Sequence, residues 1–167
     1  GSCVMKTDDV PINDVRWHRA SDGSEISFDD IIKVINDHKE HTVHVGTDSH
    51  NSKMLSRRFV FSTTICLYLQ GKGGFYFFYR NTSKIKYKSL ADRLTEEVHR
   101  SISIANNIRN IIDNRKITIH ADVNKDIKFK SGKYSPMFKS WVESLGYEYV
   151  QKPDSWASTG VADRHAK

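Results

Sequence analysis

The sequence predicts one α/β domain built on a mixed sheet. Three strand-like segments come first, a long helical segment follows, and the chain then alternates strand, helix, strand and helix. This succession favours a mixed sheet over a doubly wound one, in which strands and helices would alternate throughout. A length of 167 residues suits a single compact core.

The first expected element is a short helix from Ser27 to about His38. It opens on a run that resembles a capping box, and its apolar residues recur at helical spacing. Residues 1–26 show no such pattern, and the first two residues are typical of a tag remnant. We therefore expect an irregular segment over 1–26 and one domain over 27–167 that begins with this helix as an N-terminal helical extension.

Three strands are expected next. The first runs from His41 to Asp48, where valines alternate with other residues before a turn-forming polar run. The segments Arg58–Leu69 and Phe75–Tyr79 are rich in β-branched and aromatic residues. A glycine-rich turn separates these two segments and predicts a hairpin.

The second half of the chain carries one long helix and three shorter elements before the last helix. Apolar residues recur every three or four positions from about Ser89 to Ile112, which indicates a helix. The other expected elements are a strand over Lys116–Asp122, a helix from Ser135 to Gly146, a strand over Tyr147–Gln151 and a last helix from about Ser155.

Composition narrows the class of protein. A formal net charge of +6 suggests a polyanionic partner, although many basic proteins never contact nucleic acid. Two cysteines exclude a disulfide framework and a cysteine-based zinc site. The chain contains neither an apolar run long enough for a membrane span nor a Walker-type phosphate loop nor a secretory signal. We therefore expect a soluble cytoplasmic protein without a nucleotide cofactor.

Two aspartates end two of the predicted strands. Asp48 closes the first strand and Asp122 the fourth. If these strands are parallel neighbours, the two carboxylates meet at one end of the sheet, close enough to share cations. Mg²⁺ and Mn²⁺ prefer such hard oxygen ligands, and two ions of this kind can promote cleavage of a phosphodiester.

Two further acids follow from helix geometry. Glu97 lies three residues after Leu94, on the expected sheet-facing side of the long helix, whereas Glu96 is expected to face solvent. Asp163 shares a stripe of the last helix with Trp156. A single aspartate at a strand end is more often a turn former or a helix cap, so the hypothesis depends on all four acids together.

Several segments around these acids together resemble the YkuK-type RNase H-like family, from about Ser27 to the end of the chain. They are Val45-Gly46-Thr47-Asp48-Ser49, Glu96-Glu97-Val98, His120-Ala121-Asp122, Lys152-Pro153-Asp154-Ser155-Trp156-Ala157-Ser158 and Val161-Ala162-Asp163-Arg164. The resemblance implies an RNase H-like fold with a five-stranded mixed sheet of order 3-2-1-4-5 flanked by helices.

The family is described as predicted RuvC- or RNase H-like nucleases, so the resemblance also implies an activity. It implies a divalent-metal-dependent nuclease that hydrolyses DNA or RNA at a two-metal site holding Mg²⁺ or Mn²⁺. The implied catalytic and metal-binding residues are Asp48, Glu97, Asp122 and Asp163. Asp154, after a proline and before a helix, is expected to cap that helix.

The positive charge falls near the same end of the predicted sheet. Loops on the Asp48 and Asp122 side, together with the first residue of the predicted strand Arg58–Leu69, hold twelve lysines and arginines, as a groove for a phosphate backbone requires. Those expected to contact nucleic acid are Arg57, Arg58, Lys84, Lys86, Lys88, Lys125, Lys128, Lys130, Lys133 and Lys152. The plainer interpretation of these residues is a solvated surface.

Alternatives stay open. A non-catalytic RNase H-like module that binds nucleic acid would keep the fold and the basic loops without turnover. A kinase of the actin and sugar-kinase superfamily would need two such domains, and this chain has room for one. His44 and His120 are expected to be hydrogen-bonded packing residues rather than catalytic ones, and the sequence leaves the oligomeric state and the choice of DNA or RNA open.

Overall fold

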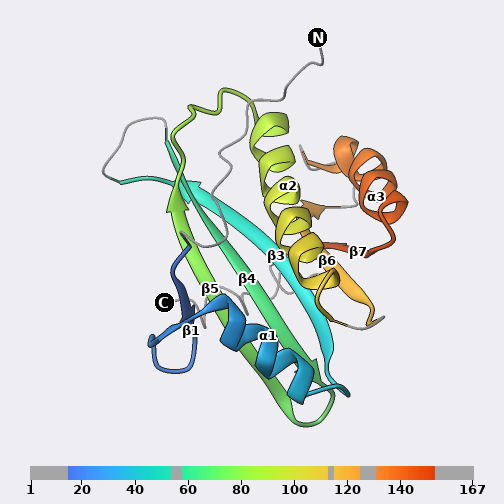
Figure 1. Ribbon diagram of the computed structural model, residues 1–167. Helices are drawn as coiled ribbons and strands as arrows, with labels where there is room; N and C mark the ends of the chain where they lie inside the picture. Colours follow the sequence, from blue (N-terminus) through green and yellow to red (C-terminus); the bar gives the residue numbers. More distant parts are fainter. Residues whose placement is uncertain (1–14, 54–57, 113–114, 125–130, 153–167) are drawn as a thin grey trace.

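Figure 1 shows the computed structural model, which describes residues 15–53, 58–112, 115–124 and 131–152. The described strands are β1 (Trp17–Arg19), β2 (Glu25–Ile26), β3 (Thr42–Asn51), β4 (Phe59–Leu69), β5 (Gly73–Thr82), β6 (Ile117–Asn124) and β7 (Glu148–Lys152). The described α-helices are α1 (Phe28–Asp37), α2 (Leu90–Arg109) and α3 (Ser135–Ser144), the last preceded by a short 3₁₀ turn over Gly132–Tyr134.

The strands form one mixed sheet in the order β2-β1-β5-β4-β3-β6-β7. β3 is antiparallel to β4 and parallel to β6, and β6 is parallel to β7. The predicted mixed α/β class is therefore confirmed, as is the parallel pairing of the strands that carry Asp48 and Asp122.

The prediction of five strands is wrong in number, because the described sheet has seven. The extra strands, β1 and β2, lie in the segment that was expected to be irregular, where β1 pairs with β5 and β2 folds back on β1. Strands of three and two residues are too short to show an alternating pattern, which is why the sequence gives no sign of them. Trp17, only 1% exposed, attaches this segment to the core.

The end of β3 also differs from the expectation. A turn was predicted directly after Asp48, but the strand continues to Asn51, which pairs with Phe59 of β4. The polar residues Ser49, His50 and Asn51 thus extend the hairpin as strand residues. Backbone pairing with β4 outweighs their turn propensity here, since propensity is a weak guide once a partner strand is present.

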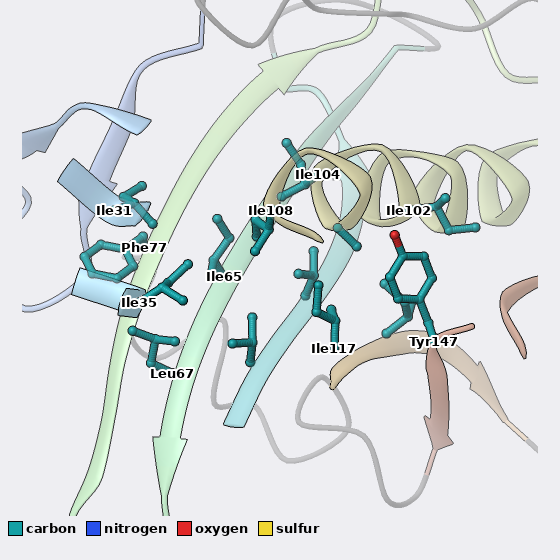
Figure 2. Packing of buried hydrophobic residues seen from close by; sticks show 14 of the residues in the cluster. Ile31, Ile35, Ile65, Leu67, Phe77, Ile102, Ile104, Ile108, Ile117 and Tyr147 are labelled. Atoms are coloured by element: carbon teal, nitrogen blue, oxygen red, sulfur yellow. The ribbon is translucent and has the colours of Figure 1, made fainter. Parts of the chain in front are cut away.

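Helices α1 and α2 pack on one side of the sheet (Figure 1). Figure 2 shows that Ile31 and Ile35 of α1 face the β4 and β5 side chains, while Ile108 of α2 lies further along the same layer. The helix α3 adds Phe138 and Val142 to this core and contacts β7, β6 and α2. No helix among the described residues combines the length and hydropathy of a membrane span.

Candidate metal centre

Three carboxylates from three different elements lie together at one end of the sheet. They belong to Asp48 of β3, Glu97 of α2 and Asp122 of β6, and one oxygen atom from each lies within 4.8 Å of the others. We call these three residues the carboxylate cluster. Asp48 and Asp122 are partly exposed, whereas Glu97 is buried.

The cluster forms where β3 and β6 stop pairing. Their last paired residues are Gly46 and His120, and Asp48 and Asp122 each stand two residues further along their strand. A period of two therefore places both aspartates above the same face. Because the strands are no longer hydrogen-bonded to each other at this level, a side chain from α2 has room to reach both.

Helix α2 begins at the same end of the sheet. The Ser89 side chain caps it by accepting a hydrogen bond of 3.1 Å from the backbone N–H of Asp92. Glu97 then lies two turns into the helix, on the face that covers β3 and β6. The start of α2 thus determines which of its side chains enters the cluster.

Glu97 is the buried member of the cluster, with 4% of its surface exposed. The Ser49 hydroxyl donates a hydrogen bond of 2.5 Å to its Oε2, while Oε1 is buried and has no hydrogen-bond partner among the described residues. Burial and the negative charge of Asp122 raise the pKa of Glu97 well above its ordinary value of 4.5, with Ser49 opposing and Asp48 adding to the rise.

These residues fit a divalent cation. Three carboxylates supply hard oxygen ligands, and Glu97 Oε1 is a buried acceptor that the described protein groups leave unsatisfied. A bound cation would satisfy that oxygen and remove the repulsion between the neighbouring carboxylates. Sequence reasoning missed Ser49, although the period of β3 places it on the side opposite Asp48, toward α2.

Lys152, the last residue of β7, also contacts the cluster. Its Nζ lies 2.5 Å from Oδ1 of Asp122, and the side chains are 35% and 28% exposed. The sequence predicted Lys152 as one of the groove lysines, and the structure places its ammonium group on a carboxylate of the cluster.

Glu96 does not face solvent, as the sequence analysis expected, but is 2% exposed. It accepts a hydrogen bond of 2.9 Å from Nε of Arg100, one turn along α2. The Arg100 guanidinium lies over the Phe61 ring, 4.1 Å from its centroid. The expectation failed because this flank of α2 packs over β4 and β5, where Arg100 also donates to Asn81 Oδ1 at 3.1 Å. The spacing of Glu96 and Arg100 does permit an ion pair.

Six of the predicted nucleic-acid-binding residues lie in the described ranges: Arg58, Lys84, Lys86, Lys88, Lys133 and Lys152. Lys86 and Lys88 are exposed and line a groove of about 390 Å³ with Tyr87 and the first turns of α2. Arg58 instead donates to the backbone carbonyl of Ser83 at 3.1 Å. The predicted residues Arg57, Lys125, Lys128, Lys130 and Asp163 lie outside the described residues, as does Asp154.

A sequence profile of the Ribonuclease H-like family matches residues 27–167 of this chain. The chain belongs to the Ribonuclease H-like family. The match covers most of the chain and includes every member of the carboxylate cluster, and it agrees with the YkuK-type resemblance seen in the sequence. Comparison with curated proteins finds no significant match.

In this Ribonuclease H-like protein, His44 of β3 and His120 of β6 form a histidine pair that precedes the cluster aspartates on the same two strands. His44 Nδ1 is 2.8 Å from His120 Nε2, and Thr42 Oγ1 is 2.7 Å from His44 Nε2. Burial, with a smaller contribution from His44, lowers the pKa of His120 to about 3. Burial also lowers the pKa of His44, which the nearby Glu148 opposes.

The histidine pair predicts a loss of stability in acid. Because the pKa of His120 is depressed on folding, unfolded chains bind more protons below pH 6.5 and stability falls as pH decreases. Between pH 7 and pH 5 this residue should account for a loss of about 2 kcal/mol in the free energy of unfolding. Urea denaturation at both pH values should show a smaller loss for His120→Gln than for the unmodified protein.

The matched control is His50→Gln, which replaces an exposed histidine of β3. This variant should keep the acid loss of the unmodified protein. Comparing variants in this way cancels the contributions of other titrating groups. Equal losses in His120→Gln and His50→Gln would contradict the assignment of His120 as a buried neutral histidine.

Proposed function

We propose that this protein is a divalent-metal-dependent nuclease that hydrolyses phosphodiester bonds in DNA or RNA. The observation that carries the proposal is the carboxylate cluster, with the unsatisfied Oε1 of Glu97, in a chain of the Ribonuclease H-like family. Its ligands would be Asp48, Glu97 and Asp122, with Asp163 as a fourth acid suggested by the sequence. Their hard oxygen atoms favour Mg²⁺ or Mn²⁺.

Each member of the cluster has its own part in this proposal. Asp48 and Asp122 are partly exposed and can hold a cation where a phosphate reaches it. Glu97 supplies a buried oxygen, and Ser49 holds its carboxylate in one orientation. The pKa of Glu97 is raised by burial and by Asp122, and a metal ligand must be ionised, so metal binding should strengthen as pH rises. When bound, a divalent ion activates water and neutralises charge on the phosphate.

The basic residues support a nucleic acid as the substrate. Exposed Lys86 and Lys88 lie in the segment just before α2, the helix that carries Glu97. They line the groove with Tyr87, so a phosphate backbone passing over the start of α2 would meet positive charge. Binding through such contacts weakens as salt concentration rises, and this dependence is measurable without turnover.

The test is cleavage of labelled substrates with Mg²⁺ or Mn²⁺: single strands, DNA and RNA duplexes, a hybrid and a four-way junction. We expect cutting of at least one substrate, its loss on metal chelation, and a decrease of at least about 100-fold in Asp48→Asn. Even groups that only support a metal ligand contribute about 10–100-fold, so a ligand itself should contribute more. The control Asp29→Asn replaces an exposed aspartate of α1 and should cut normally.

The outcome that would contradict the nuclease is salt-sensitive binding without cutting of any substrate. That result would favour the non-catalytic module, in which the basic segment binds nucleic acid and the carboxylate cluster has no catalytic part. Cutting that persists in Asp48→Asn would instead point to a different site.

A further inference from the structure

Lys152 brings a positive charge to the carboxylate cluster from the edge of the sheet. β7 pairs with β6 in parallel, and the pairing shifts register between Ala121 and Asn124, so that Lys152 pairs with Asn124. Asp122 lies inside this irregular stretch. The shift therefore aligns the end of β7 with the segment that carries Asp122, and the Lys152 ammonium reaches Oδ1 at 2.5 Å.

This ion pair differs from the Lys116–Glu148 pair, which lies where β6 and β7 begin. Lys116 and Glu148 lie 2.9 Å apart, with side chains 82% and 52% exposed, so that solvent screens their attraction. The Lys152–Asp122 pair is less exposed and lies beside Glu97 and Asp48. Its positive charge therefore acts on a group of clustered carboxylates rather than on a single solvated one.

An ammonium group and a divalent ion compete for the same oxygen atoms. A protonated lysine has three donors and no acceptor, so it cannot be a metal ligand and repels a cation next to it. With Lys152 on one oxygen of Asp122, the oxygens that the described residues leave for a cation are those of Asp48 and Glu97 and the second oxygen of Asp122. This set suits one ion better than two. Asp163, the fourth proposed acid, lies outside the described residues.

We propose that the ammonium group of Lys152 takes one of the two cation positions at Asp122, so that the chain binds one divalent ion in place of two. The inference rests on the proposed metal-dependent function. It replaces the two-metal site that the family resemblance implies with a site for one metal ion. In a two-ion site the second ion balances charge on the phosphate. Here a lysine fixed by its carboxylate supplies that charge and donates hydrogen bonds to a phosphate oxygen of the substrate.

The test counts bound ions and needs no turnover. Mn²⁺ is titrated into the full chain while electron paramagnetic resonance measures the free ion. We expect one Mn²⁺ per chain in the unmodified protein and two in Lys152→Met, in which a second ion is free to bind at Asp122. Lys152→Arg keeps the charge and should bind one. Lys116→Met, the matched control from the exposed pair, should also bind one.

Two results would overturn the inference while leaving the metal centre in place: two Mn²⁺ per chain in the unmodified protein, or one Mn²⁺ in Lys152→Met with the unmodified affinity. Absence of Mn²⁺ binding in every variant would overturn the metal centre itself and the inference with it. The two failures are therefore distinguishable in the same titration.

Discussion

Replacing Glu97 by glutamine is expected to abolish divalent-metal binding and lower metal-dependent cleavage by more than about 100-fold, while stabilising the metal-free protein at neutral pH. The first effect follows from the loss of a buried carboxylate from the cluster. The stabilisation follows because Glu97 is buried beside Asp122 and Asp48, where its ionisation is unfavourable. An amide of the same shape carries no charge, so it avoids that cost.

The stabilisation has a defined pH dependence. Glu97 has a higher pKa in the folded protein than in the unfolded chain, so folded molecules bind more protons above pH 4.5. The stability that this group contributes to the metal-free protein is therefore lost as pH rises through the folded pKa. Glu97→Gln should remove this decline. Urea denaturation in the presence of a chelator, at several pH values, measures the change directly.

Glu96, the residue before Glu97, provides a control with the opposite expected effect on stability. Glu96→Gln removes the charged partner of Arg100, and both side chains are buried. Breaking a buried ion pair on one side costs about 3–5 kcal/mol, because the remaining buried charge loses that carboxylate. Glu96→Gln should therefore lower stability and keep metal binding. Metal binding lost in Glu96→Gln and kept in Glu97→Gln would contradict the assignment of Glu97 to the cluster.

Replacing Trp17 by alanine is expected to destabilise the protein by about 3–5 kcal/mol. Trp17 is 1% exposed, packs edge-on against Tyr79 with ring centroids 4.8 Å apart, and lies 6.2 Å from the Phe28 ring. It connects β1 to the core through β5 and α1, although the family match begins only at residue 27. Removing its side chain leaves a cavity that the neighbouring strands cannot fill.

Thermal and urea denaturation measure the effect of Trp17→Ala. The matched control is Phe75→Ala, which removes an aromatic ring of β5 that is 42% exposed and should cost clearly less. Equal stability of Trp17→Ala and the unmodified protein would mean that β1 contributes nothing to the core. That result would restore the first expectation, in which residues 1–26 lie outside the fold.

Local pattern was enough to predict most elements of this protein. The apolar repeat of α2 and the β-branched run of β4 each span ten residues or more, so the period is visible without knowledge of any partner. Asp48 and Asp122 could be proposed as neighbours because strand order and a period of two are also local properties. The burial of Glu97 followed from its place on the helix in the same way.

Other features depend on contacts between segments that are distant in the chain, and no local pattern contains them. β1 and β2 exist because β5 offers an unpaired edge to a segment too short to show a period. Glu96 is buried because its flank of α2, shared with Arg100, packs over β4 and β5. Lys152 contacts Asp122 because a register shift between β6 and β7 aligns two strand ends that are 30 positions apart. Periodicity is a property of one element, whereas register and burial arise only when two elements meet.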